Sequence, residues 1–300
     1  MRILLTGANG LFGQHLLTLL ANQQDEEVFA TGKGLNRNPA GNYTYLSCDL
    51  TNQAEVKKLI ELARPDYLIH AAAKTQVDDC EVNRESCWES NVLATGYLLD
   101  EMSKGSSHVQ YISTDFVFDG ERGNYLETDQ PNPVNYYGES KLEAEKLVQS
   151  SRLSWSIART VLVYGVARDL SRSNILTWIY KSLKNNQPIR VVTDQIRTPT
   201  FVEDLAEGSL LILKNQAEGI YHISGDEVMS PYDLAIKIAD FFDFDSSLIT
   251  PVDASTFSQA GKRPQKTGFV IDKARESLGF NPKTFDESLE VLESRLMEFQ

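Results

Sequence analysis

A glycine motif near the start of the chain restricts the possible folds more than any other feature. Residues 3–5 form a short apolar run, and residues 11–21 carry apolar side chains at helical spacing. Between these runs stands the motif G-x-x-G-x-x-G. A strand, such a turn and a helix together let backbone N–H groups approach a pyrophosphate, which the positive end of the helix dipole attracts. We therefore predict a dinucleotide-binding unit whose first cofactor contacts are Gly7, Gly10, Leu11, Phe12 and Gly13.

Short apolar runs alternate with helical patterns along the first half of the chain. The expected strands are residues 3–5, 28–30, 43–48, 67–69, 109–112 and 155–158, and the expected helices are residues 11–21, 54–63, 83–102 and 137–149. Continuous apolar strands separated by helices are typical of a parallel sheet that is covered on both faces. We therefore predict an α/β fold with a doubly wound parallel sheet of the Rossmann type, in a dinucleotide-binding domain over residues 1–165.

The pattern changes after about residue 165. The expected helices there are residues 173–183, 202–213, 231–242 and 285–297, and the expected strands are residues 189–192 and 220–224. We predict a smaller α/β substrate-binding domain over residues 166–300. This domain is expected to be discontinuous, with about residues 188–224 returning to the Rossmann sheet.

The chain is acidic, which argues against several classes of partner. Its 300 residues carry 42 acidic and 29 basic side chains, a formal net charge of −13. Nucleic acids and anionic membranes attract basic surfaces, so we expect neither as a partner. Three cysteines without C-x-x-C spacing and four scattered histidines predict buried free thiols, with neither a disulfide framework nor a metal site. No apolar run approaches the ~18 residues of a membrane-spanning helix, and we expect a cytoplasmic protein.

The region after the second expected strand bears on the choice of cofactor. A site that prefers NAD usually places an acidic residue ~20 residues beyond the glycines, where it holds the 2′-hydroxyl of the ribose. No acidic residue occurs between Glu27 and Asp49, whereas Lys33 and Arg37 lie in that interval. Because cations suit a 2′-phosphate, we predict NADP(H) over NAD(H). The alternative is that both residues are solvated loop charges.

A tyrosine and a lysine four positions apart form a candidate catalytic pair. Helical geometry places Tyr137 and Lys141 on one face and turns Tyr136 away. An ammonium beside a phenol is expected to lower the phenol pKa from its usual value near ~10, which suits proton transfer at neutral pH. The alternative is an exposed surface pair.

Two other expected strands end in residues that suit a ligand site, because ligands of open α/β sheets bind at the carboxyl ends of the strands. Thr114 follows the strand at 109–112, where it could hydrogen-bond a substrate oxygen beside Tyr137; a plain polar turn is the alternative. Three small residues follow the strand at 67–69 and leave space for a flat nucleotide: Ala71, Ala72 and Ala73. Asn91 lies within an expected helix, where it either bonds the backbone or faces water.

Taken together, these motifs resemble the extended short-chain dehydrogenase/reductase family in order and approximate spacing. Within that family the chain looks most like the dTDP-4-dehydrorhamnose reductases. This narrower resemblance rests on S-T-D-F-V-F-D-G at residues 113–120, Y-G-E-S-K-L-E-A-E at residues 137–145 and T-P-T at residues 198–200. It covers nearly the whole chain.

The resemblance implies roles for individual residues. Tyr137 would be the general acid, Lys141 would orient the nicotinamide ribose and Thr114 would bind the keto oxygen. Asn91 would hold a helix bulge or a water that supports Lys141. Asp49 and Leu50 would border the adenine. The remaining implied substrate contacts, in which either arginine could instead be structural, are Thr75, Val77, Asp78, Asp115, Arg197 and Arg263.

The implied reaction is NADPH-dependent reduction of the 4-keto group of a nucleotide-linked 6-deoxy sugar, as in dTDP-L-rhamnose biosynthesis. A 4,6-dehydratase is disfavoured because Phe116, not an acid, follows Asp115. A 4-epimerase stays open, as does a regulatory cofactor-binding subunit like the β subunit of methionine adenosyltransferase. Family members commonly pair through the helices that hold Asn91 and Tyr137, which implies a homodimer. Phe116 and the pair Ile196-Arg197 depart from the usual reductase pattern near the sugar.

Overall fold

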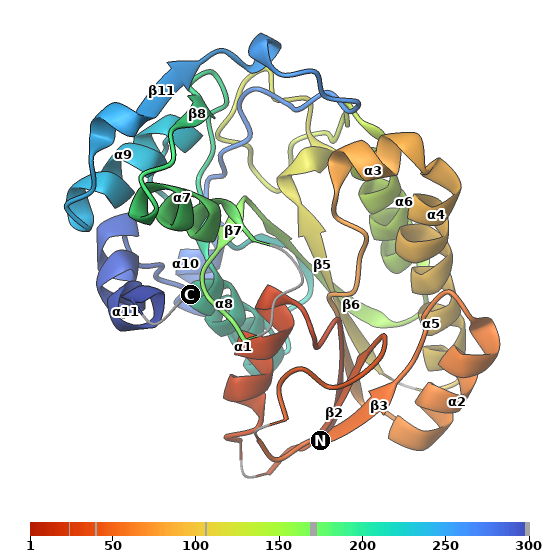
Figure 1. Ribbon diagram of the computed structural model, residues 1–300. Helices are drawn as coiled ribbons and strands as arrows, with labels where there is room; N and C mark the ends of the chain where they lie inside the picture. Colours follow the sequence, from red (N-terminus) through yellow and green to blue (C-terminus); the bar gives the residue numbers. More distant parts are fainter. Residues whose placement is uncertain (24, 40, 106, 169–172, 298–300) are drawn as a thin grey trace.

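A seven-stranded parallel sheet forms the centre of the computed structural model, which describes residues 1–23, 25–39, 41–105, 107–168 and 173–297 (Figure 1). The strand order is β10-β6-β5-β4-β1-β2-β3. Its strands are β1 (Arg2–Thr6), β2 (Glu27–Gly32), β3 (Thr44–Ser47), β4 (Tyr67–His70), β5 (His108–Thr114), β6 (Ser154–Thr160) and β10 (Gly219–His222). Every neighbouring pair runs parallel. The predicted doubly wound Rossmann sheet is confirmed.

Eleven α-helices and several short elements surround the sheet in the described part of the chain. The α-helices are α1 (Leu11–Leu20), α2 (Gln53–Ala63), α3 (Val77–Val82), α4 (Arg84–Trp88), α5 (Ala94–Met102), α6 (Tyr136–Ser150), α7 (Ile175–Lys184), α8 (Val202–Lys214), α9 (Pro231–Phe241), α10 (Asp272–Leu278) and α11 (Phe285–Met297). The short elements are a π-helical turn, η1 (Glu89–Leu93), and three 3₁₀ turns, η2 (Asp115–Val117), η3 (Ser246–Leu248) and η4 (Ala254–Thr256). Two small two-stranded sheets pair β7 (Val163–Tyr164) with β9 (Thr200–Phe201) and β8 (Ile189–Val192) with β11 (Ile249–Val252). No described helix combines the length and apolar character needed to span a membrane.

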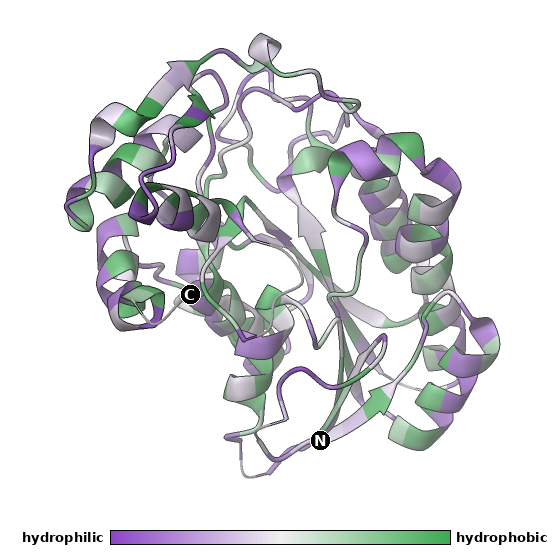
Figure 2. Ribbon diagram, viewed as in Figure 1, coloured by the Kyte–Doolittle hydropathy of each residue, from purple (hydrophilic) through white to green (hydrophobic). Residues whose placement is uncertain are grey.

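Strand β1 shows why the sheet needs helices on both faces. Leu4 packs with α2, α5 and α6 on one face, whereas Ile3 and Leu5 pack with α1 and α8 on the other. All three side chains are fully buried, and each contributes roughly 1.5–3 kcal/mol through burial. The long helices carry both hydrophobic and hydrophilic segments, as helices with one buried face do (Figure 2). The continuous apolar runs in the sequence therefore reflect a sheet that is buried on both sides.

A second lobe lies beside the carboxyl ends of the strands. Its core joins α7, α9 and α11 with β8 and β11. The prediction that residues 188–224 return to the Rossmann sheet is correct only in part. Strand β10 joins that sheet beside β6, and α8 covers it, but β8 pairs with β11 in the second lobe. The alternating pattern of β8 could not reveal its partner, because β11 lies about 60 residues further along the chain.

The single helix predicted over residues 83–102 is wrong. The chain instead forms α4, the π-helical turn η1 and α5. Asn91 lies in η1 and is buried. A π-helical turn inserts one extra residue into the helical repeat and often marks a functional site. Here it turns the Asn91 amide toward the interior, where it finds hydrogen-bond partners.

Candidate active site

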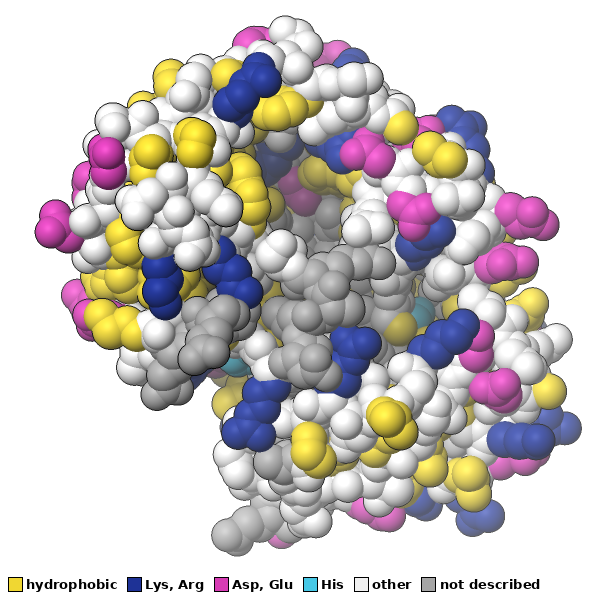
Figure 3. All heavy atoms as spheres, in the orientation of Figure 1, with side chains coloured by type: hydrophobic (Ala, Val, Ile, Leu, Met, Phe, Trp, Pro, Cys, Tyr) yellow, Lys and Arg dark blue, Asp and Glu magenta, His cyan; other side chains and the backbone are white. Residues whose placement is uncertain are grey.

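A cavity of about 1170 Å³ opens at the carboxyl ends of the strands, next to the point between β1 and β4 where the strand order reverses. Such switch points are the usual ligand sites of open α/β sheets. Figure 3 shows the molecule hollowed between the second lobe and the main sheet, with lysines and arginines near the rim. The predicted site residues that line the cavity are Gly7, Gly10, Leu11, Phe12, Gly13, Lys33, Arg37, Asp49, Leu50, Ala71, Ala72, Ala73, Thr75, Val77, Thr114, Asp115, Tyr137, Lys141, Arg197 and Arg263.

The glycine turn is packed so closely that Cβ atoms at Gly7 and Gly13 would collide with the backbone. Gly7 has a φ of +76°, and a Cβ atom on Gly13 would lie 2.2 Å from the Gly7 carbonyl oxygen. The Gly10 N–H donates to that same oxygen at 3.0 Å. Helix α1 begins directly after Gly10, without a side-chain cap. The turn therefore fits a pyrophosphate, which would meet backbone N–H groups and the start of α1.

At the other end of the cavity, Lys33 and Asp49 form an ion pair. The Lys33 ammonium lies 2.6 Å from an Asp49 carboxylate oxygen, and its side chain is 79% exposed. The hydrogen bond from Lys33 holds the pKa of Asp49 below its usual value. Arg37 lies nearby, and its backbone N–H donates to the Asn9 side chain at 3.0 Å. The cavity thus has an exposed cationic corner, in which Lys33 already has an acidic partner.

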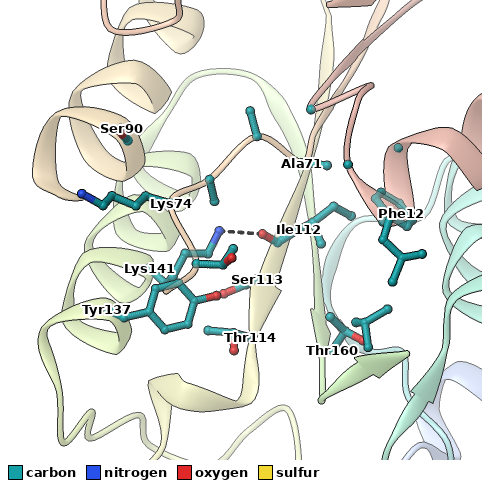
Figure 4. Close-up of a pocket in the computed structure, with 18 of the residues that line it drawn as sticks. Phe12, Ala71, Lys74, Ser90, Ile112, Ser113, Thr114, Tyr137, Lys141 and Thr160 are labelled. Carbon is teal, nitrogen blue, oxygen red and sulfur yellow. Dashed lines mark hydrogen bonds between the residues drawn. The ribbon is translucent and has the colours of Figure 1, made fainter. Parts of the chain in front are cut away.

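Tyr137 and Lys141 lie on one face of α6, as predicted. The Asn135 side chain caps this helix by accepting from the Gly138 N–H at 2.8 Å. Tyr137 and Lys141 are both buried and both line the cavity. In Figure 4 the Tyr137 ring points toward Ser113 and Thr114 at the end of β5, and the Lys141 ammonium points toward the Ile112 carbonyl oxygen. Tyr136 points elsewhere and packs against Trp88 and Arg84.

The prediction that Lys141 lowers the pKa of Tyr137 is wrong. Burial raises the pKa of the Tyr137 phenol above its usual value, and the Asp115 carboxylate raises it further. The Lys141 ammonium donates to the Ile112 carbonyl oxygen at 2.8 Å and lies 4.0 Å from the centre of the Tyr111 ring. Burial lowers the pKa of Lys141 to about 7. Sequence spacing shows which residues share a helix face, but the pKa depends on what surrounds that face.

Thr114 and Asp115 belong to a buried polar cluster. The Thr114 hydroxyl donates to an Asp115 carboxylate oxygen at 3.0 Å and accepts from the Phe116 N–H at 3.3 Å. The Thr267 hydroxyl donates to the other Asp115 oxygen. Arg197 lies 3.8 Å from the same carboxylate. Asp115 is only 3% exposed, so its carboxylate oxygens bond mainly to other groups of the protein.

Asn91, which was also predicted to belong to the cofactor site through a helix bulge or a water, lies in the π-helical turn and does not itself line the cavity. Its side-chain oxygen accepts from the Lys74 N–H at 2.8 Å, and its amide donates to the Lys74 carbonyl at 3.0 Å and to the Ser140 hydroxyl at 2.9 Å. Ser140 in turn donates to the Tyr137 carbonyl. Asn91 therefore joins the loop after β4 to the helix that carries the tyrosine.

The two predicted arginines are held by the protein itself. Arg263 donates to both carboxylate oxygens of Asp78, at 2.5 and 2.7 Å. Asp78 lies outside the main cavity, against a smaller one of about 510 Å³ that Arg263 also lines. Arg197 donates to the backbone carbonyls of Ile196, Pro264 and Gln265. Both arginines face the main cavity, yet each also has a structural role.

Some residues of the cavity were not predicted. Lys74 follows the three predicted alanines after β4, and Thr160 is the last residue of β6. Both would have been predicted if the residues considered at the end of each expected strand had included one or two more. Others come from the second lobe and carry no motif: Asn174, Ile175, Gln195 and Pro231. The thiols of Cys48, Cys80 and Cys87 are buried and free, as predicted.

Comparison with known proteins shows similarity to one family along nearly the whole chain. The family model described as the RmlD substrate binding domain matches residues 1–297. A dTDP-4-dehydrorhamnose reductase of Aggregatibacter actinomycetemcomitans is 30% identical, over 96% of this chain and 97% of that protein. The methionine adenosyltransferase 2 subunit beta of Bos taurus is 32% identical, over 94% of this chain and 84% of that protein.

A solved structure agrees in fold and length. The dTDP-4-dehydrorhamnose reductase of Bacillus anthracis, solved in complex with NADP, superposes with a TM-score of 0.86 at 29% identity, covering 98% of this chain and 99% of that one. The UDP-glucuronic acid 4-epimerase of Bacillus cereus, solved with NAD, has a TM-score of 0.86 at 21% identity and shares the fold. The predicted resemblance is thus confirmed, and the chain belongs to the RmlD substrate binding domain family of extended short-chain dehydrogenase/reductases.

Proposed function

We propose that this protein reduces the 4-keto group of a nucleotide-linked 6-deoxy sugar with NADPH, in the manner of a dTDP-4-dehydrorhamnose reductase. The observation that carries the proposal is the convergence of Thr114, Tyr137 and Lys141 with the glycine turn in one cavity. A proton donor and a dinucleotide site within one cavity suit carbonyl reduction. The similarity to reductases along the whole chain supports the same reaction.

In this reaction the protein positions the substrate and supplies the proton. Bound NADPH supplies the hydride. The phenol of Tyr137 donates its proton to the carbonyl oxygen as that oxygen gains negative charge. Lys141, one turn further along α6, stays hydrogen-bonded to the Ile112 carbonyl near the end of β5. Burial of both side chains excludes water from the donor. The start of α1 would hold the pyrophosphate, and Asp49 and Leu50 would border the adenine.

The proposed preference for NADPH rests on Lys33 and Arg37 at the exposed corner of the cavity. A 2′-phosphate there would compete with Asp49 for the Lys33 ammonium. The ratio of kcat/KM for NADPH to kcat/KM for NADH tests this preference. We expect a ratio above 1 that falls at least about tenfold in the Lys33→Ala, Arg37→Ala double variant. A wild-type ratio at or below 1 would contradict the preference.

The decisive experiment is NADPH oxidation over a panel of 4-keto nucleotide sugars that differ in base and in sugar. We expect turnover with at least one dTDP-linked 4-keto-6-deoxy sugar. Tyr137→Phe should lower kcat by about 10²–10⁴-fold and leave NADPH affinity nearly unchanged, because only the proton donor is lost. Tyr136→Phe is the matched control and should keep wild-type kcat, because Tyr136 points away from the cavity. Equal losses in the two variants would contradict the assignment of Tyr137.

A second candidate function is supported by the similarity to methionine adenosyltransferase 2 subunit beta. In that case the chain would bind the cofactor and act through a partner enzyme. Co-purification with a methionine adenosyltransferase, without turnover of any sugar in the panel, would favour this function over the reductase.

We also propose a cytoplasmic homodimer that pairs through the helices that hold Asn91 and Tyr137, which in the structure are η1 with the adjoining α5, and α6. These helices lie next to one another, and Leu93, just before α5, is 39% exposed. Size-exclusion chromatography with light scattering at micromolar concentration should give twice the chain mass of 33.7 kDa. A monomer under those conditions would contradict the dimer.

A further inference from the structure

Asn9, the third residue of the glycine motif, connects that turn to the loop that follows β2. Its side-chain oxygen accepts from the Arg37 N–H at 3.0 Å. Its amide donates to the Leu35 carbonyl at 3.0 Å and to the Tyr45 hydroxyl at 3.0 Å. An asparagine amide has two protons to donate, and both are used here. The Asn9 side chain is therefore fixed by groups that lie 26 to 36 positions further along the chain.

Tyr45 on β3 extends this connection to the end of β2. Its hydroxyl lies 3.0 Å from both the Gly32 and the Gly34 carbonyl oxygen, which share its proton. A Cβ atom on Gly32 would lie 3.0 Å from the Asn9 amide nitrogen and 3.2 Å from the Tyr45 hydroxyl. A glycine at this position therefore lets both side chains approach the strand end closely. One hydrogen-bonded group thus joins the glycine turn, the end of β2 and the loop after it.

The loop held in this way carries both cations of the proposed 2′-phosphate site. Lys33 and Arg37 line the cavity together with Asn9. The described residues 33–39 form neither helix nor strand, so their backbone groups need other hydrogen-bond partners. Asn9 supplies such partners at Leu35 and at Arg37. The loop that bears the two cations is therefore held against the turn that would bind the pyrophosphate.

We propose that Asn9 is a positioning residue for cofactor selectivity, which holds Lys33 and Arg37 where the 2′-phosphate of NADP(H) would bind. This role rests on the proposed preference for NADPH. A loop that is ordered before binding loses less conformational entropy when the phosphate binds. NAD(H) has a 2′-hydroxyl in place of that phosphate and gains little from the two cations. Loss of the Asn9 side chain should therefore weaken binding of NADP(H) much more than binding of NAD(H).

Asn9→Ala in the full-length protein tests this role without a sugar substrate. Isothermal titration calorimetry gives the ratio of the Kd for NAD⁺ to the Kd for NADP⁺. We expect a wild-type ratio above 1 that falls at least about threefold in Asn9→Ala, because Lys33 and Arg37 must then be ordered on binding. The Kd for NAD⁺ should stay close to its wild-type value. A role limited to supporting the glycine turn would weaken both cofactors equally, because both carry the same pyrophosphate.

Two tyrosine variants form a matched pair for the same measurement. Tyr45→Phe removes the hydroxyl that accepts from Asn9 and should lower the ratio, as Asn9→Ala does. Tyr43→Phe removes a hydroxyl that bonds the Asn36 side chain instead, and should keep the wild-type ratio. If Asn9→Ala does not give folded protein, Tyr45→Phe decides the outcome.

Three results would overturn the proposal. One is a wild-type ratio in Asn9→Ala, even if the stability of the protein or the Kd for both cofactors changes. The second is an equal fall of the ratio in Tyr43→Phe and Tyr45→Phe, since any loosening of the segment would then have the same effect. The third is a wild-type protein that binds NADP⁺ no more tightly than NAD⁺, which would also contradict the proposed preference. If no sugar in the panel is turned over, the proposed reduction fails, but these binding ratios still decide the role of Asn9.

Discussion

At the scale of single residues, the glycine turn shows how strictly backbone contacts limit a sequence. A Cβ atom on Gly13 would lie 2.2 Å from the Gly7 oxygen and 2.8 Å from the Ala8 Cα, and both atoms belong to the backbone. Neither can move aside as the end of a flexible side chain can. Gly96 on α5 is different, because the nearest atom to its Cβ would be the end of the Leu147 side chain at 4.0 Å.

These two glycines should respond in opposite ways to the same change. Gly13→Ala should lower the free energy of unfolding by about 3 kcal/mol, because overpacking forces the turn to shift. Gly96→Ala should raise it by up to about 1 kcal/mol, because alanine is the better helix former. Urea unfolding of both variants measures these changes. A Gly13→Ala protein as stable as the wild type would mean that the turn adapts more easily than its contacts indicate.

At the scale of elements, the π-helical turn η1 connects two parts of the site. Asn91 satisfies both backbone groups of Lys74 and reaches Ser140 on α6. The turn therefore holds the loop after β4 and the helix of Tyr137 in one arrangement. Nearby, His70 is enclosed by the hydroxyls of Thr6 and Thr95, and burial lowers its pKa to about 3, so the imidazole is neutral.

Asn91→Ala should destabilise the protein by about 2–3 kcal/mol, because it leaves buried polar groups without partners. The free energy of unfolding in urea measures the loss. Asn215→Ala on the exposed end of α8 is the control, since its side chain bonds only the Leu211 carbonyl of the same helix. We expect less than about 0.5 kcal/mol for the control. Equal losses in the two variants would contradict the connecting role of Asn91.

At the scale of the whole molecule, the ion pair of Asp78 and Arg263 joins segments 185 positions apart. Arg263 holds the pKa of Asp78 down to about 2, against an ordinary value of 3.8. A carboxyl with a lowered pKa in the folded state stabilises the protein fully above its unfolded pKa. This contribution is therefore present above about pH 4 and is lost as the pH falls toward 2.

Asp78→Asn should lower the free energy of unfolding by about 0.5–1 kcal/mol at pH 7, a modest value because the carboxylate is half exposed. The difference from the wild type should shrink below pH 4 and fall to a small remainder near pH 2, where Asp78 is about half protonated in the folded state and fully protonated in the unfolded state. Urea unfolding at pH 7, 4 and 2.5 follows this change. Asp240→Asn, at an exposed position of α9, is the control, and a difference for Asp78→Asn that persists at low pH would contradict the charge argument.

Much of the architecture follows from local patterns in the sequence. The order of strands and helices, the glycine turn and the shared face of Tyr137 and Lys141 depend on residues a few positions apart, because backbone geometry sets those relations. The elements that were missed, such as α3 and β11, are short and carry no clear period. The strand-end residues were predicted because the carboxyl ends of parallel strands meet at one edge of the sheet.

Only the tertiary structure decided the partners and the pKa values of those residues. The partners of Asp115, the pairing of Asp78 with Arg263 and the raised pKa of Tyr137 each depend on segments that are far apart in the chain. Spacing along a helix cannot show how deeply a phenol is buried or which charge faces it. Local geometry is fixed by neighbouring residues, whereas desolvation and long-range contacts arise only when distant segments pack together.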